Sequence, residues 1–125
     1  MNIIDSSGWM HYFMNGHLAE QYAGYVSNLK KIVTPTIVFY EVHRKIKKEV
    51  GKEAALDAVA QLQETTVVPL TDSLAYLASN LSLEHKLTMA DAIIYATALD
   101  SGVELITSDA DFKNLPSVTY IAEDE

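Results

Sequence analysis

The alternation of short strand-like segments with helix-like segments constrains the fold of this chain most strongly. The strand-like segments are rich in β-branched residues, which favour strands, and lie at residues 2–4, 32–33, 66–68, 103–107 and 118–121. Apolar residues between them recur at helical spacing, as in the stripe Val38, Val42, Ile46 and Val50. Strands that alternate with helices predict an α/β fold in which helices cover both faces of a parallel sheet.

Capping and breaking residues set the expected helix boundaries. One helix follows Asp5, and the others are expected at residues 17–29, 36–50, 54–63, 73–83 and 88–100. Thr71 and Thr88 can cap helices, whereas Gly51 and Gly102 can end them. No linker divides the 125 residues, so we expect a single domain over residues 1–125.

Composition excludes several classes of site. The chain has no cysteine, which excludes disulfides, zinc thiolate sites and cysteine nucleophiles. It has no apolar run long enough for a membrane span and no signal pattern, so we expect a cytoplasmic protein without a membrane partner.

Positive charge is concentrated in one segment of an acidic chain. The net charge is -8, yet residues 30–52 hold seven of the nine Lys and Arg and only two carboxylates, a net of +5. This segment is either a solvated helix face or an anchor for phosphates, with Arg44, Lys45 and Lys48 as the candidate contacts.

Four acids occupy unusual positions in or after apolar segments. They are Asp5 and Asp109, which follow predicted strands, and Glu41 and Asp91, which interrupt apolar helices. Each has a structural alternative: Asp5 can cap a helix, Glu41 can pair with Lys45, Asp91 can complete a capping box with Thr88, and Asp109 can turn a loop.

Taken together, these positions favour a shared site. Carboxyl ends of parallel strands meet at one edge of a sheet, and clustered carboxylates repel one another unless protons or cations neutralise them. Carboxylate oxygens prefer hard cations such as Mg²⁺ or Mn²⁺, which activate water for attack on phosphodiesters.

Four motifs in this order resemble the PIN-domain ribonucleases, specifically VapC-type toxins of toxin–antitoxin pairs. The motifs are Ile3-Ile4-Asp5-Ser6-Ser7, Val38-Phe39-Tyr40-Glu41-Val42, the segment Thr88 to Ala98 around Asp91, and Leu105-Ile106-Thr107-Ser108-Asp109-Ala110-Asp111-Phe112. The resemblance spans almost the whole chain. It implies a three-layer α/β/α PIN-like fold with a central parallel sheet of four to five strands.

The resemblance also implies an activity and a set of site residues. The implied catalytic acids are Asp5, Glu41, Asp91 and Asp109, of which Asp5, Asp91 and Asp109 would hold Mg²⁺ or Mn²⁺. Ser6, Thr107 and Asp111 would support them. The implied partners are an RNA substrate, a small antitoxin protein and a second copy of the chain in a homodimer. We therefore expect Asp5→Asn to fold but not to cleave RNA.

Two other functional classes remain open from the sequence. A receiver-like phosphoacceptor domain shares the length and the alternation, although Asp5 lacks the adjacent acid and Thr107 and Ser108 stand where a lysine is expected. A non-catalytic binding module, in which the acids are only caps and ion pairs, is the other alternative.

Overall fold

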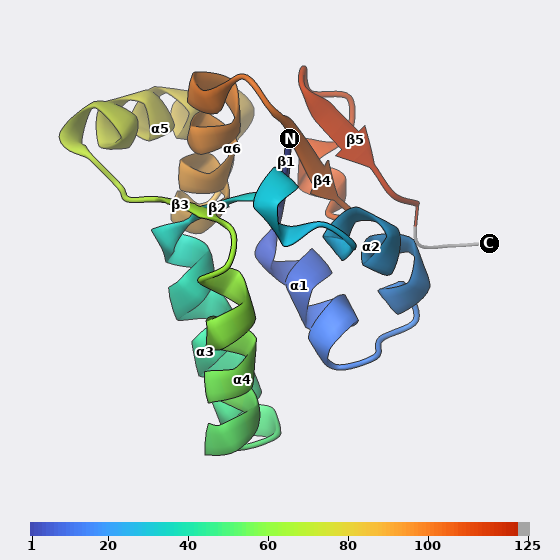
Figure 1. Ribbon diagram of the computed structural model, residues 1–125. Coiled ribbons are helices and arrows are strands. Elements are labelled where there is room, and N and C mark those ends of the chain that lie inside the picture. Colours follow the sequence, from blue (N-terminus) through green and yellow to red (C-terminus); the bar gives the residue numbers. More distant parts are fainter. Residues whose placement is uncertain (123–125) are drawn as a thin grey trace.

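The computed structural model describes residues 1–122, and Figure 1 shows how their helices and strands are arranged. The strands are β1 (Asn2–Ile4), β2 (Val33–Pro35), β3 (Thr66–Val68), β4 (Glu104–Thr107) and β5 (Val118–Tyr120). Within these residues, β1, β4 and β5 form one parallel sheet and β2 and β3 a second. A bridge between Asn2 and Ile32 links the two sheets, so the strands follow the order β3-β2-β1-β4-β5.

The helices pack mainly in pairs of sequence neighbours. They are α1 (Ser6–Phe13), α2 (Ala19–Val26), α3 (Thr36–Glu49), α4 (Lys52–Leu62), α5 (Asp72–His85) and α6 (Met89–Ser101), with short 3-10 turns η1 (Leu29–Lys31) and η2 (Ala110–Phe112). Contacts join α1 to α2, α3 to α4 and α5 to α6, and the α3–α4 pair extends away from the sheet in Figure 1. No helix in the described part of the chain has the length and apolar character of a membrane span.

Burial of consecutive residues shows that helices cover both faces of the central strands. Ile3 and Ile4 point to opposite faces of β1, and both are fully buried. Leu105 and Ile106 in β4 are buried in the same way. Helix α6 packs on β1, β2 and β4, and α1 also contacts β4. These observations confirm the predicted α/β fold with its parallel sheet.

Two sequence predictions differ from the structure. The single helix expected at residues 17–29 is instead α2 followed by η1, because the Asn28 side chain accepts a hydrogen bond from the Lys30 amide at 3.1 Å and starts a new turn. Val50, expected on the buried stripe of α3, lies at the C-terminal cap and is 61% exposed. The helix has ended there, so the four-residue spacing no longer directs Val50 to the core.

Gly8 allows α1 to approach its neighbours closely. A Cβ atom at Gly8 would lie 2.4 Å from Tyr22 Cε1 and 2.7 Å from Ile4 Cγ2. We expect Gly8→Ala to lower the free energy of unfolding by roughly 1–3 kcal/mol, because the core around it must shift. Gly24→Ala in α2 is the matched control, since nothing lies within 4 Å of its added Cβ.

Urea unfolding of both variants checks this expectation. Gly24→Ala should raise the free energy of unfolding by about 0.5–1 kcal/mol, because alanine favours a helix. Changes of the same sign and size in the two variants would contradict a packing role for Gly8.

Candidate metal and RNA site

The four candidate acids line one open pocket of about 800 Å³. Asp5 follows β1, Asp109 follows β4 by two residues, Asp91 lies in the first turn of α6, and Glu41 lies on α3. The remaining lining residues are Ser6, Ser7, Met10, His11, Met14, Gly16, Tyr40, Arg44 and Lys45. The parallel topology therefore brings together carboxylates that are far apart in the sequence.

Asp5 is the most deeply buried of these acids and is fixed by hydrogen bonds. Its carboxylate accepts from the Gly8 amide at 2.9 Å, from the Thr107 hydroxyl at 2.6 Å and from the Ser7 hydroxyl at 3.1 Å. Thr107 in turn accepts from the Asp109 amide at 3.0 Å, which links the two strand ends. These contacts hold the Asp5 carboxylate in one orientation at the pocket wall.

Burial and mutual repulsion raise the pKa values of two of the acids. Burial raises the pKa of Asp5 from 3.8 to about 6, and the charge of Asp109 adds to this, although the three hydrogen bonds oppose it. Burial also raises the pKa of Asp91 to about 6, and here the charges of Asp109, Asp5 and Glu41 contribute. The pocket thus holds more negative charge than its own residues neutralise, and a cation would relieve this excess.

Asp91, Asp109 and Asp111 have the geometry for holding a metal ion. Each offers one carboxylate oxygen, and these oxygens all lie within 4.8 Å of one another. Asp109 also accepts the Asp111 amide at 2.9 Å, which places the two side chains at the start of η2. The donors are all oxygens, which fits Mg²⁺ or Mn²⁺.

The structure groups the acids somewhat differently from the prediction. Asp111, expected only in support, joins Asp91 and Asp109, whereas Asp5 is not in that group of three within residues 1–122. Asp5 nevertheless lines the same pocket and interacts electrostatically with Asp109 and Asp91.

Glu41 is held by the chain segment that follows β1. It accepts a hydrogen bond of 2.5 Å from the Ser6 hydroxyl, 35 residues away in the sequence. Lys45, the alternative partner of Glu41, forms an ion pair with Glu49 instead, with 2.9 Å between Lys45 Nζ and Glu49 Oε2. Ser6 and Thr107 thus donate hydrogen bonds to Glu41 and Asp5, and their supporting role in catalysis stays a prediction.

Capping contacts accompany the pocket. Asp5 caps α1, Asp109 caps η2, and the Thr88 hydroxyl accepts the Asp91 amide at 3.4 Å, which is one of the two hydrogen bonds of a capping box. Capping and pocket formation do not exclude each other, since a capping carboxylate keeps further lone pairs for another ligand.

Sequence reasoning missed several lining residues on α1 and at its C-terminal cap, Met14. Met10, His11 and Met14 line the pocket with Ser6 and Ser7. They follow Ser7 by three, four and seven residues, so they extend the face of the helix on which Ser7 lies. This helical spacing is the sequence signal that could have identified them. The His11 ring also lies 5.1 Å from that of His17, a proximity that no short motif indicated.

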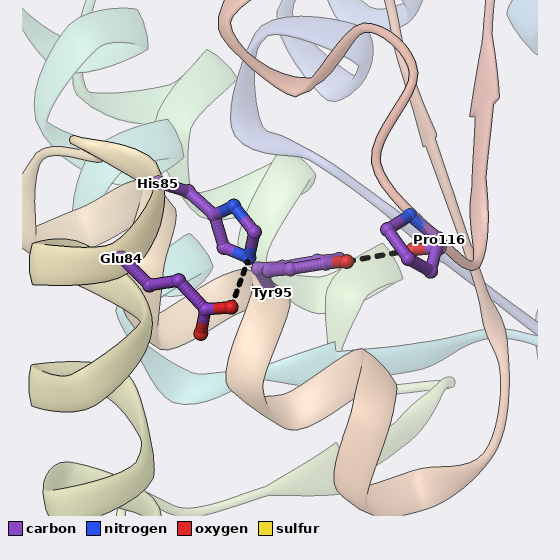
Figure 2. Close-up of polar contacts among 4 residues, drawn as sticks. All are labelled: Glu84, His85, Tyr95 and Pro116. Carbon is purple, nitrogen blue, oxygen red and sulfur yellow. Dashed lines mark hydrogen bonds and ion pairs between the residues drawn. The ribbon is translucent and has the colours of Figure 1, made fainter.

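Tyr95 helps to fix the segment that follows Asp109 and Asp111. Figure 2 shows its hydroxyl donating to the Pro116 carbonyl, a bond of 2.7 Å. The His85 ring lies edge-on to the Tyr95 ring with centroids 6.0 Å apart, and the Glu84 Oε2 atom lies 3.9 Å from His85 Nε2. These contacts tie α5, α6 and the segment before β5 together.

Comparisons with known proteins identify the family. The sequence model of the PIN domain matches residues 3–118. No curated protein matches the chain.

Several solved structures share the fold of this chain. A toxin–antitoxin complex from Klebsiella pneumoniae contains a chain that is 25% identical, with a TM-score of 0.81 over 95% of this chain and 96% of that one. VapC20 of Mycobacterium tuberculosis, a sarcin-ricin loop cleaving toxin, is 20% identical with a TM-score of 0.80 over 94% of this chain and 97% of that one. A DNA-bound VapBC from Salmonella typhimurium is 16% identical, with a TM-score of 0.73 over 96% of each chain.

The family match disagrees with the receiver-domain alternative and agrees with the resemblance carried by the four sequence motifs. The fold, the parallel strand order and the strand-end acids are all consistent with this assignment. The chain belongs to the PIN domain family.

Proposed function

We propose that the chain is a Mg²⁺- or Mn²⁺-dependent endoribonuclease that acts as the toxin of a toxin–antitoxin pair. The observation that carries the proposal is the convergence of four acids, from four separate segments of the chain, on one open pocket. The raised pKa values of Asp5 and Asp91, to about 6, support a site whose charge is balanced by a bound cation.

Each group in the pocket has a proposed role. Asp5, Asp91 and Asp109 hold the cation, and Asp111, which shares the group of close oxygens with Asp91 and Asp109, supports them. When bound, such a cation polarises phosphoryl oxygens and lowers the pKa of bound water. Glu41, oriented by Ser6, accepts a hydrogen bond from the attacking water and aligns it with the phosphorus atom.

Two basic side chains of the pocket, Arg44 and Lys45, bind the substrate backbone. Arg44 and Lys45 lie on the same helix as Glu41 and line the same pocket. In a protein of net charge -8, they provide the local attraction that an RNA phosphate needs.

The proposal includes an assembly and a location. Residues 1–125 form one nuclease domain in the cytoplasm, which pairs with a second copy and is inhibited by a small antitoxin protein. The K. pneumoniae neighbour comes from a toxin–antitoxin complex, which supports the antitoxin partner. Light scattering of the purified chain measures the dimer directly, and growth arrest on expression, relieved by coexpression of an antitoxin, tests the toxin role.

Metal and RNA assays on the purified chain test the activity. Fluorescent single-stranded RNA should be cleaved with Mn²⁺ or Mg²⁺ and remain intact with EDTA. Calorimetric titration with Mn²⁺ should give saturable heat at pH 8 and much weaker binding at pH 5, because protons then occupy Asp5 and Asp91, whose pKa values are about 6. Absence of saturable heat would instead favour the non-catalytic binding module, in which the acids are only caps.

A further inference from the structure

A second groove lies beside the acid pocket on the outer side of α3. It has a volume of about 470 Å³ and is lined by Tyr40, His43, Arg44, Lys47 and Lys48. Tyr40 and Arg44 line both the groove and the acid pocket. The two hollows therefore adjoin each other at these two residues, and a flexible ligand bound at the acids can extend into the groove.

The groove follows from the sequence of α3. Its five lining residues are spaced by three, one, three and one positions, which places them on one stripe of the helix. Val38, Val42 and Ile46 form the opposite, buried stripe. Helix α3 is thus fixed to the core by one side and presents a basic, aromatic side to solvent.

The positive charge of the groove is available for a ligand. Among the described residues, no carboxylate forms an ion pair with Arg44, Lys47 or Lys48. Lys45, one position along the same helix, is by contrast paired with Glu49. Three unpaired cations on a strongly acidic chain attract phosphate, and carboxylates elsewhere on the surface repel it.

Tyr40 adds a feature that charge alone does not explain. Tyr40 is 63% exposed, although it lines both hollows and the opposite side of α3 is buried at Val38, Val42 and Ile46. A flat aromatic ring beside unpaired cations is the arrangement that binds an unpaired nucleobase, with stacking on the ring and the backbone held by the charges.

We propose that this groove is a subsite for a nucleotide of single-stranded RNA next to the one held at the acids. Tyr40 stacks on the base, and Arg44, Lys47 and Lys48 bind the adjoining phosphates. A duplex is not the ligand, because its bases are stacked on one another and their faces are closed to Tyr40. The inference rests on the proposed nuclease function and names the substrate form that this function requires.

Binding of a fluorescein-labelled 12-nucleotide single-stranded RNA tests the subsite, with Ca²⁺ in place of Mn²⁺ to prevent cleavage. Tyr40→Ala should weaken binding roughly tenfold, whereas Tyr40→Phe, which keeps the ring, should bind within about twofold of the unsubstituted chain. Tyr76→Ala removes a ring that is 70% exposed on α5, outside both hollows, and serves as the matched control. In cleavage assays with Mn²⁺, Tyr40→Ala should raise KM and leave kcat unchanged.

The salt dependence of binding tests the phosphate contacts separately. Lys47→Gln combined with Lys48→Gln should reduce the slope of log K against log salt by about 1.4, because each phosphate contact on a single strand contributes about 0.7. Lys30→Gln combined with Lys31→Gln removes the same charge from exposed positions that line neither hollow. It should leave the slope unchanged.

The results separate the subsite from the nuclease function. If the unsubstituted chain cleaves RNA but Tyr40→Ala binds as tightly as Tyr40→Phe, the function stands and the subsite is wrong. Equal slopes for the two double lysine variants would likewise overturn the phosphate contacts. A chain that neither binds nor cleaves the RNA overturns both proposals.

Discussion

The Asp109→Asn variant is expected to lose Mn²⁺-dependent RNA cleavage by roughly a thousandfold while it still folds. A divalent cation contributes several kcal/mol to phosphoryl transfer, and each 1.4 kcal/mol is a factor of ten in rate. Asp109 lines the acid pocket and shares the group of close oxygens with Asp91 and Asp111. An asparagine keeps the oxygen that accepts the Asp111 amide at 2.9 Å, so the cap of η2 is preserved.

Two further measurements make the expectation specific. The pKa values of Asp5 and Asp91 should both fall in Asp109→Asn, because the charge of Asp109 contributes to raising each of them. Carboxyl NMR titration of the metal-free protein measures this. The matched control is Asp57→Asn, an exposed acid on α4 that does not line the pocket. Undiminished cleavage by Asp109→Asn in a protein with intact circular dichroism would remove Asp109 from the site.

The sequence predicts the fold well because its local signals agree with one another. Thr71 and Thr88 cap helices as expected, and Gly102 ends α6 with a φ of 68°. The predicted helix boundaries are wrong where a single residue interrupts or ends a helix that the apolar spacing would continue. The helix expected at residues 17–29 is divided by the Asn28 cap, and apolar spacing alone does not reveal where α3 ends before Val50.

The site is less completely predictable for a geometric reason. Strand-end positions indicate that Asp5 and Asp109 converge, but they do not indicate which oxygens approach within bonding reach of one cation. The turn of η2 brings the Asp111 carboxylate close to those of Asp91 and Asp109, whereas the sequence of this segment indicates only an acidic loop. The residues that line the groove at Tyr40 share one stripe of α3, but the position of that stripe beside the acid pocket is a tertiary property. The roles of these residues stay predictions until the variants are measured.

Asp5 makes the stability of the metal-free protein fall as pH rises. Its pKa is about 6 in the folded chain against an ordinary 3.8, so the folded state binds this proton more tightly than the unfolded state does. The stabilisation is therefore complete below pH 4 and is lost as pH rises to about 6. The difference corresponds to roughly 3 kcal/mol of unfolding free energy for this buried group. Urea unfolding between pH 4 and pH 8 measures it.

The Asp5→Asn variant isolates this contribution from those of other groups. It should match the unsubstituted chain in stability near pH 4 and exceed it at pH 8, by up to roughly 3 kcal/mol less any loss of the Thr107 hydrogen bond. Identical pH dependence in the two proteins would contradict the raised pKa of Asp5.

Metal binding should reverse the order of stability at pH 8. Mn²⁺ at saturating concentration is expected to stabilise the unsubstituted chain more than Asp5→Asn, because a bound cation replaces the proton on the buried carboxylate. The same variant should be inactive on RNA. A gain in stability that accompanies a loss of cleavage is the result expected when a carboxylate is buried for its chemistry. The loss of cleavage is the decisive part, because a carboxylate retained only as a helix cap would not give it.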